Sequence, residues 1–265
     1  MSDDEGFVLF LCGLITLVAW APLVFAMFAM RRRLRSSSFS RGLLLGLPAV
    51  VTLALAAMLQ SWADVGVRES TVYLGFYLVM GLAWIGGSVR LLDRLGLSVR
   101  DDVLERNNVP AALAIYGATV GITLAFAGGN FGDGPGWWVV IFTAALGLAS
   151  LAVLWLVLDK LTWIADRITI DRNPGAAVHA GLLFIAWGTV AMRASAGDWI
   201  DAVQTTVDFA PALLPMGALL ALAVVVEGVL RPRRAAGSVA LPLSIGVGLA
   251  VLAVAVAWVV WRGWW

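Results

Sequence analysis

His179 and Glu227 are ionisable side chains inside apolar stretches of this chain, where charge is costly and is usually linked to function. His179 is the only histidine, and it stands about one turn into a run of apolar and small residues. Imidazole titrates near neutral pH, so His179 is a candidate proton relay. Glu227 stands near the end of another apolar run, four residues before Arg231. Both side chains are therefore candidates for an ion pathway.

Each candidate also has a structural alternative. Glu227 and Arg231 have the spacing and the order that favour an ion pair along one helix face. The position that matches His179 in the duplicated pattern described below holds Ala114. A duplicated architecture therefore does not require a histidine there, and simple pairing or burial remains open for both candidates.

Composition argues against several other kinds of site. The chain has one cysteine, Cys12, and one histidine, so a single copy offers neither a disulfide nor a soft-metal site. No segment has the spacing of a P-loop, a GxGxxG fingerprint, an HExxH zinc motif or a Ser–His–Asp set. The sequence therefore predicts no catalytic residue, no metal, no cofactor and no enzymatic activity.

One polar pattern occurs twice between apolar runs. Leu-Asp-Arg-Leu at 92–95 precedes Glu-Arg-Asn at 105–107, and Leu-Asp-Lys-Leu at 158–161 precedes Asp-Arg-Asn at 171–173. The two copies lie 66 residues apart, and the first holds one inserted residue before the alanines that follow. As structural or partner-binding residues we single out Asp93, Glu105, Arg106, Asn107, Asn108, Asp159, Asp171, Arg172 and Asn173.

The asparagines in this pattern have a local physical role. Asn107 or Asn108, and likewise Asn173, stand just before segments that begin with proline and alanines. Asparagine is a preferred helix N-cap because its side-chain oxygen accepts an unpaired backbone N–H, and proline suits the first helical turn. For Asp93 and Asp159, a buried Asp–Arg network between the copies and solvated charge at headgroup depth are both open.

The elements around these residues are membrane helices. Hydrophobic residues make up 61% of the 265 residues and charged residues only 13%, against about 25% charged in a soluble domain. A spanning helix needs about 20 mostly apolar residues. The chain contains about eight such runs, at 6–30, 42–62, 71–92, 111–128, 137–158, 176–196, 209–230 and 239–261.

The distribution of charge predicts the orientation of these helices. Alternate loops hold 15 of the 18 Lys and Arg residues, and cytoplasmic loops are the ones that retain basic residues. Both termini are then expected outside the cytoplasm, and the acidic start of the chain favours a retained first helix over a cleaved signal peptide. The net charge of +1 gives no reason to expect nucleic acid as a partner.

The duplicated pattern predicts an internal symmetry in a single membrane domain of residues 1–265. The first repeat covers about 72–129 and the second about 137–197, with flanking hairpins at 6–62 and 209–261. Both repeats cross the membrane in the same sense, which predicts a pseudo-twofold axis along the membrane normal. Small residues that allow close helix packing are Gly117 and Gly121 in one repeat and Gly181 in the other.

These residues resemble a bacterial membrane family called domain of unknown function, family 350. In that family an acidic residue, asparagine, alanines and a glycine recur where a membrane helix begins, in paired hairpins. The resemblance covers about residues 72–197 and implies a bacterial inner-membrane protein linked to envelope or membrane-stress systems. The matching residues are Asp102, Glu105, Asn107, Asn108, Ala111, Ala112, Gly117, Asp171, Asn173, Ala176, Ala177 and Gly181.

Two functions follow as hypotheses. The first is a non-enzymatic scaffold or partner subunit, in a bilayer, that presents its duplicated loops to a cytoplasmic or membrane protein and forms homo-oligomers. The second is an ion channel or transporter built on the two-repeat core, with a wet path near His179 or Glu227.

Overall fold

The computed structural model describes residues 2–30, 38–230 and 241–263, and every regular element in these ranges is a helix. Short helices that join the long ones are α3 (Val65–Arg68), the π-helix η1 (Val99–Glu105), α7 (Ile164–Thr169), α9 (Ala202–Phe209) and the 3-10 helix η2 (Ala210–Ala212). The long helices are α1 (Asp3–Met30), α2 (Ser38–Trp62), α4 (Thr71–Arg94), α5 (Val109–Gly128), α6 (Trp137–Thr162), α8 (Pro174–Ser195), α10 (Leu213–Leu230) and α11 (Leu241–Arg262).

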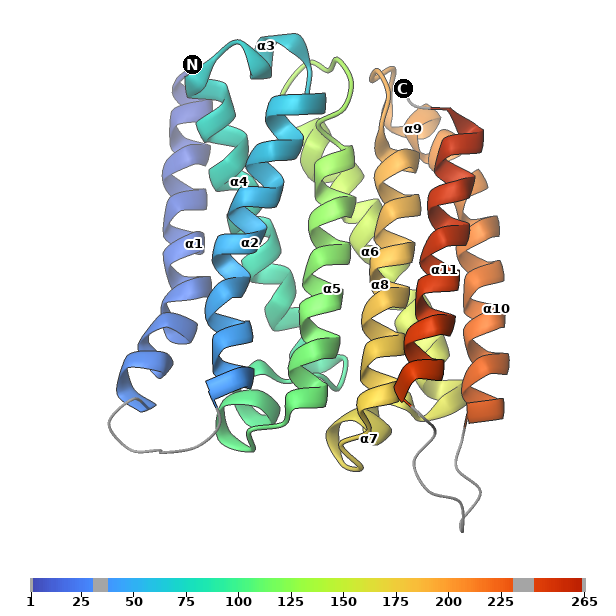
Figure 1. The fold of residues 1–265 in the computed structure, drawn as a ribbon. Coiled ribbons are helices and arrows are strands. Elements are labelled where there is room, and N and C mark those ends of the chain that lie inside the picture. Colours follow the sequence, from blue (N-terminus) through green and yellow to red (C-terminus); the bar gives the residue numbers. More distant parts are fainter. Residues whose placement is uncertain (1, 31–37, 231–240, 264–265) are drawn as a thin grey trace.

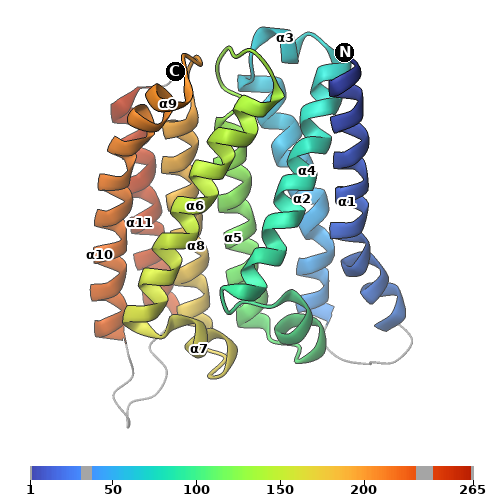
Figure 2. The same cartoon turned by 180° about the vertical axis from the view of Figure 1, so that it is seen from behind.

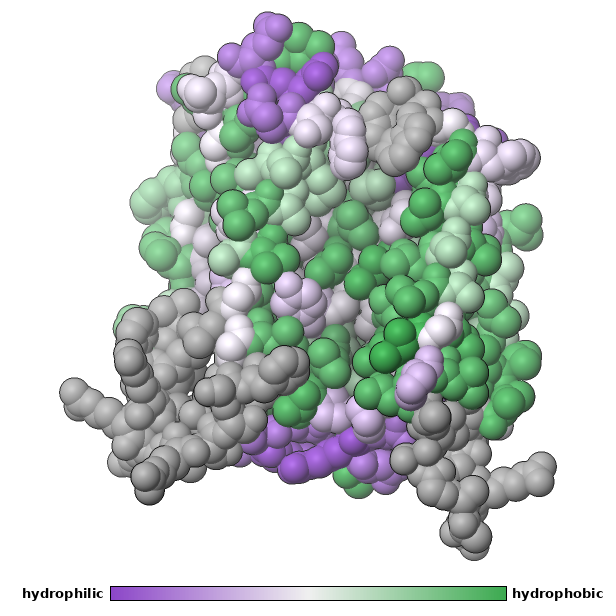
Figure 3. Space-filling view, viewed as in Figure 1, coloured by the Kyte–Doolittle hydropathy of each residue, from purple (hydrophilic) through white to green (hydrophobic). Residues whose placement is uncertain are grey.

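Seven helices in the described ranges are long and apolar enough to cross a bilayer, and α2 contributes a shorter apolar stretch, Gly46–Trp62. The whole of α2 has 25 residues, about 37 Å at 1.5 Å per residue, which exceeds a hydrocarbon core of about 30 Å. Figure 3 shows an apolar band between two polar ends of the molecule. The prediction of an all-α polytopic membrane bundle is confirmed.

The long helices form two layers (Figures 1 and 2). One layer holds α2, α5, α8 and α11 in that order, and the other holds α1, α4, α6 and α10. Helix α1 packs on α4 and α2 on α5, while α10 packs on α6 and α11 on α8. The most extensive contact joins α5 to α8 at the centre, and most residues of these two helices are buried.

The seam between α5 and α8 is built on glycine. A Cβ atom added to Gly117 would lie 2.5 Å from the carbonyl oxygen of Gly181, and one added to Gly188 would lie 2.5 Å from Cα of Gly121. Real Cβ atoms essentially never approach backbone atoms this closely. The three glycines singled out from the sequence therefore lie at one helix contact, to which the structure adds Gly188 and Gly128.

The predicted spans agree with the helices to within about one turn, with one informative difference. The span expected at 209–230 is two elements, because α10 begins only at Leu213, after η2. Pro211 lies in that 3-10 turn, where its missing N–H interrupts the α-helical ladder. The basic residues expected at 31–35 and 231–234 lie outside the described residues.

Candidate functional site: a polar platform and a buried ion cluster

The turn between α4 and α5 is organised around two buried polar side chains. Ser98 Oγ accepts a hydrogen bond from Asp101 N at 3.1 Å, and Ser98 N donates to Asp102 Oδ2 at 3.0 Å. This reciprocal arrangement resembles a capping box. The buried Asp102 carboxylate also pairs with Arg106, with 3.3 Å between Oδ1 and Nη1. The next buried side chain, Asn108, accepts from Ala111 N at 3.2 Å and so caps α5.

The turn between α6 and α8 has a matching asparagine cap, but the match is shifted by one residue from the alignment predicted from the sequence. Asn173 Oδ1 accepts from Ala176 N at 3.0 Å and caps α8, as Asn108 caps α5. Arg172 and Asn107 precede these caps with the same φ of 52°. The equivalent caps are therefore 65 residues apart, and the expected pairing of Asn107 with Asn173 is wrong by one residue.

A single residue accounts for this change of register. Six positions separate Asp93 from Val99, the first residue of η1, but only five separate Asp159 from Ile164, the first residue of α7. From the first residue of each short helix to its asparagine cap there are nine positions in both copies. The extra residue of the first copy therefore lies between the end of α4 and the start of η1.

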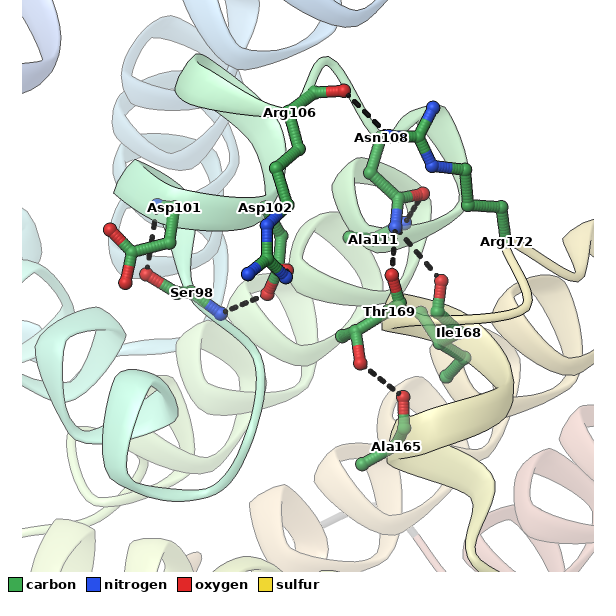
Figure 4. A network of polar contacts seen from close by, with 10 residues as sticks. All are labelled: Ser98, Asp101, Asp102, Arg106, Asn108, Ala111, Ala165, Ile168, Thr169 and Arg172. Carbon is green, nitrogen blue, oxygen red and sulfur yellow. Dashed lines mark hydrogen bonds and ion pairs between the residues drawn. The ribbon is translucent and has the colours of Figure 1, made fainter.

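The two turns bind directly to each other (Figure 4). Asn108 Nδ2 donates to Ile168 O at 3.0 Å and to Thr169 O at 3.1 Å, and Arg172 Nη2 donates to Arg106 O at 3.0 Å. Backbone carbonyls at the end of α7 thus accept hydrogen bonds from the first turn, and the carbonyl of Arg106, just after η1, accepts one from the second. We call residues 98–108 and 163–173 together the polar platform.

Asp93 and Asp159 do not join the hairpins, so of the two alternatives left open by the sequence, the Asp–Arg network between the copies is not formed by these two side chains. Asp93 is exposed at the end of α4. Asp159 Oδ1 accepts from Ala165 N at 2.9 Å, which caps α7 within its own turn. The link between the hairpins is made by Asn108 and Arg172 instead, through backbone carbonyls.

Replacing Asn108 by alanine is expected to cost more stability than replacing Asn173 by alanine. Both changes remove a cap, which is worth about 1 kcal/mol. Only Asn108→Ala also leaves the carbonyls of Ile168 and Thr169 without their amide donor, which adds about 1–3 kcal/mol for buried polar groups. Thermal unfolding of the purified variants in detergent measures the difference. Equal losses would show that the bridge between the turns contributes nothing.

A cluster of three ionisable side chains joins α7 to α8 and α10. Arg167 Nη1 of α7 pairs with Glu227 Oε2 of α10, and Glu227 Oε1 lies 2.7 Å from Nδ1 of His179 in α8. His179 is fully buried and Glu227 is 1% exposed. A carboxylate can only accept here, so His179 donates through Nδ1. The Nε2 atom of His179 has no hydrogen-bond partner among the described residues.

This cluster gives Glu227 two partners that the sequence did not predict. Arg167 and His179 each contact one of its carboxylate oxygens, and the predicted partner Arg231 lies outside the described residues. The structure thus brings the two predicted ion-pathway residues into contact, which their separation of 48 residues concealed. Arg167 was missed, although its spacing from the buried Ile164 and Ile168 places it on the inward face of α7.

Comparison with known proteins gives one match. The profile of the family described as Domain of Unknown Function (DUF350) matches residues 62–195, just over half of the chain. These residues include both hairpins, the polar platform and the α5–α8 seam. No curated protein and no solved structure matches the chain significantly. The chain therefore belongs to the family described as Domain of Unknown Function (DUF350).

Proposed function

We propose that this chain is a non-enzymatic membrane scaffold that binds a protein partner through the polar platform. The observation that carries the proposal is the bridge from Asn108 to Ile168 and Thr169. It joins two turns, about 60 residues apart, into one surface held by buried hydrogen bonds. A preordered surface loses less conformational entropy on binding than a flexible loop does.

The charge pattern of the platform favours a protein partner. The platform itself exposes three basic and four acidic side chains, and the adjoining ends of α4 and α6 bring the totals to five of each. An interspersed, balanced surface offers complementarity to a protein and little attraction to nucleic acid. The exposed charged residues are Asp93, Arg94, Arg100, Asp101, Glu105, Arg106, Lys160, Asp166, Asp171 and Arg172.

The platform faces the cytoplasm of a bacterial inner membrane in this proposal. The basic loops of the sequence support that orientation, and it leaves both termini outside. Figure 1 supports a common side for the platform, the end of α1 and the end of α10, with the start of α1 and the end of α11 opposite. The link to envelope or membrane-stress systems rests on the family resemblance.

An internal repeat with a pseudo-twofold axis along the membrane normal is part of the proposal. The matching caps of Asn108 and Asn173 support it. The packing of α1 on α4 and α2 on α5 also matches that of α10 on α6 and α11 on α8. In this scheme the flanking hairpins are related by the same axis, and further copies of the chain assemble through the lipid-facing helices.

Charge reversal on the platform tests the proposed partner binding. Glu105 and Asp171 are exposed, one on each turn, and neither side chain makes the bridge. The double variant Glu105→Arg/Asp171→Arg should fold and lose the proteins that copurify with the wild type after crosslinking in membranes. Quantitative mass spectrometry measures the loss.

The matched control reverses two exposed acids, Glu69→Arg/Asp133→Arg. Glu69 follows α3 and Asp133 lies between α5 and α6, in connections at the end of the bundle opposite to α7 (Figure 1). This variant has the same change of net charge and should keep the partner. Retention of the same proteins by the platform variant at wild-type stoichiometry would refute the scaffold function.

The buried cluster favours a second candidate function, proton-coupled transport or ion conduction. Ionisable groups within a membrane bundle often mark ion or proton pathways, and the unpartnered Nε2 of His179 leaves one site for a proton or water. The close α5–α8 seam argues against a pore between these helices, so a path would run along α8 and α10.

Flux in proteoliposomes tests this candidate. If the cluster carries protons, Glu227→Gln should abolish a proton flux that the wild type supports, because glutamine keeps the shape and removes the titratable group. A pH-sensitive dye inside the vesicles measures it, with Glu69→Gln as the control on the other face. Absence of flux in the wild type would remove this candidate.

A further inference from the structure

A cavity of about 480 Å³ lies between α1, α4 and η1. Its walls are apolar, and Trp20, Leu23, Val89 and Leu104 are all buried. The volume falls within the range of about 300–1,000 Å³ that is common for small-molecule sites. The cavity does not include the buried ion cluster, which lies in the other half of the molecule beneath α7.

A proline in α1 accounts for this opening. Pro22 has no N–H, so the carbonyl of Val18 lacks its intrahelical partner, and prolines bend helices at such points. In Figures 1 and 2 the end of α1 diverges from the neighbouring helices. Arg90 of α4 donates from Nη2 to this carbonyl of Val18. The backbone carbonyl that Pro22 leaves without an intrahelical donor is therefore hydrogen-bonded to a side chain of α4.

Trp20 and Gly86 line the cavity where α1 packs against α4. Trp20 Nε1 donates to Leu82 O at 2.9 Å. The indole packs against Gly86, where an added Cβ would lie 2.6 Å from Nε1. These contacts hold the indole in place as part of the apolar wall.

Near the end of α4 and along η1, the cavity is lined by charged side chains of both signs. Arg100 Nε and Glu105 Oε1 pair with each other at 3.1 Å. The other two charged lining residues are Arg90 and Asp93, which are exposed and lie about one turn apart on α4. Arg90 has further N–H groups beyond the one that Val18 accepts. The lining therefore offers a guanidinium and a carboxylate about one helical turn apart near the end of α4.

We propose that this cavity binds a zwitterionic phospholipid with a primary ammonium headgroup, of the phosphatidylethanolamine type. One acyl chain lies among the apolar walls, the phosphate accepts hydrogen bonds from Arg90, and the ammonium donates to Asp93. A lipid that carries only the phosphate, such as phosphatidylglycerol, leaves the Asp93 carboxylate unpaired beside an anion. Charge complementarity thus selects the zwitterionic headgroup over the anionic one.

Native mass spectrometry of the delipidated full-length protein tests the proposal. Dioleoyl phosphatidylethanolamine and dioleoyl phosphatidylglycerol, which share their acyl chains, are titrated separately in the same detergent. The wild type should bind one phosphatidylethanolamine about tenfold more tightly than phosphatidylglycerol, the size of one charge-assisted contact. Asp93→Asn should remove this preference, because the amide no longer attracts an ammonium.

Two further variants separate the cavity from general lipid affinity. Val89→Phe enlarges a wall side chain and should weaken binding of both lipids. Arg94→Gln removes an exposed charge near the end of the same helix that does not line the cavity, and it should bind like the wild type. Equal affinity of the wild type for the two lipids, or unchanged binding by both Asp93→Asn and Val89→Phe, would overturn the proposal.

Discussion

Replacing Glu227 by leucine is expected to destabilise the protein by about 3–5 kcal/mol, the cost of removing one partner of a buried ion pair. The change leaves the Arg167 guanidinium, whose side chain is 11% exposed, without its carboxylate. It also removes the acceptor of His179 Nδ1. Chemical unfolding in mixed detergent–denaturant micelles, followed by tryptophan fluorescence, measures the loss.

A double-mutant cycle distinguishes pairing from packing at this site. Arg167→Met alone should be similarly damaging, because it strands the Glu227 carboxylate. Arg167→Met/Glu227→Leu should recover most of the loss, since only the imidazole of His179 then remains without its partner. If the double variant loses the sum of the two single effects, the charges do not interact and the cluster has another role.

The sequence predicts the long helices well because each apolar run is close to the length of a bilayer crossing. Helix α6 begins at Trp137 and α5 ends at Gly128, both where predicted. The short elements α3, α7 and α9 were not predicted. Helices of four to eight residues contain too few turns for a periodic apolar pattern to stand out from loop sequence.

The candidate site was predictable only in part, and for a different reason. The residue types at the turns pointed to asparagine caps, and local capping rules are sufficient for Asn173. Choosing Asn108 over Asn107 required knowing that the extra residue of the first copy lies before η1, so that the copies are 65 and not 66 residues apart at the caps. The partner of Glu227 could not be predicted from neighbouring residues either. Arg167 lies 60 residues away in the sequence and contacts Glu227 only in the folded bundle.

Replacing Gly117 or Gly121 by alanine is expected to lower stability by about 1–3 kcal/mol or more, the usual cost of overpacking a close contact. In an ordinary helix the same change is favourable by about 1 kcal/mol. Here the neighbours of the new methyl group are backbone atoms of α8, which cannot rotate away as a side chain can. Thermal unfolding of the purified variants in detergent measures the shift in midpoint.

Gly87→Ala in α4 and Gly246→Ala in α11 are the matched controls, because an added Cβ at either position meets nothing within 4 Å. They should be neutral or slightly stabilising, and seam variants that behave like them would contradict the close contact of α5 and α8.

The seam variants should also disturb the platform. Asn108 and Asn173 are the N-caps of α5 and α8, so any separation at Gly117 lengthens the hydrogen bonds from Asn108 to the end of α7. Gly117→Ala should therefore weaken partner copurification even at temperatures where the bundle stays folded, whereas Gly87→Ala should leave it unchanged.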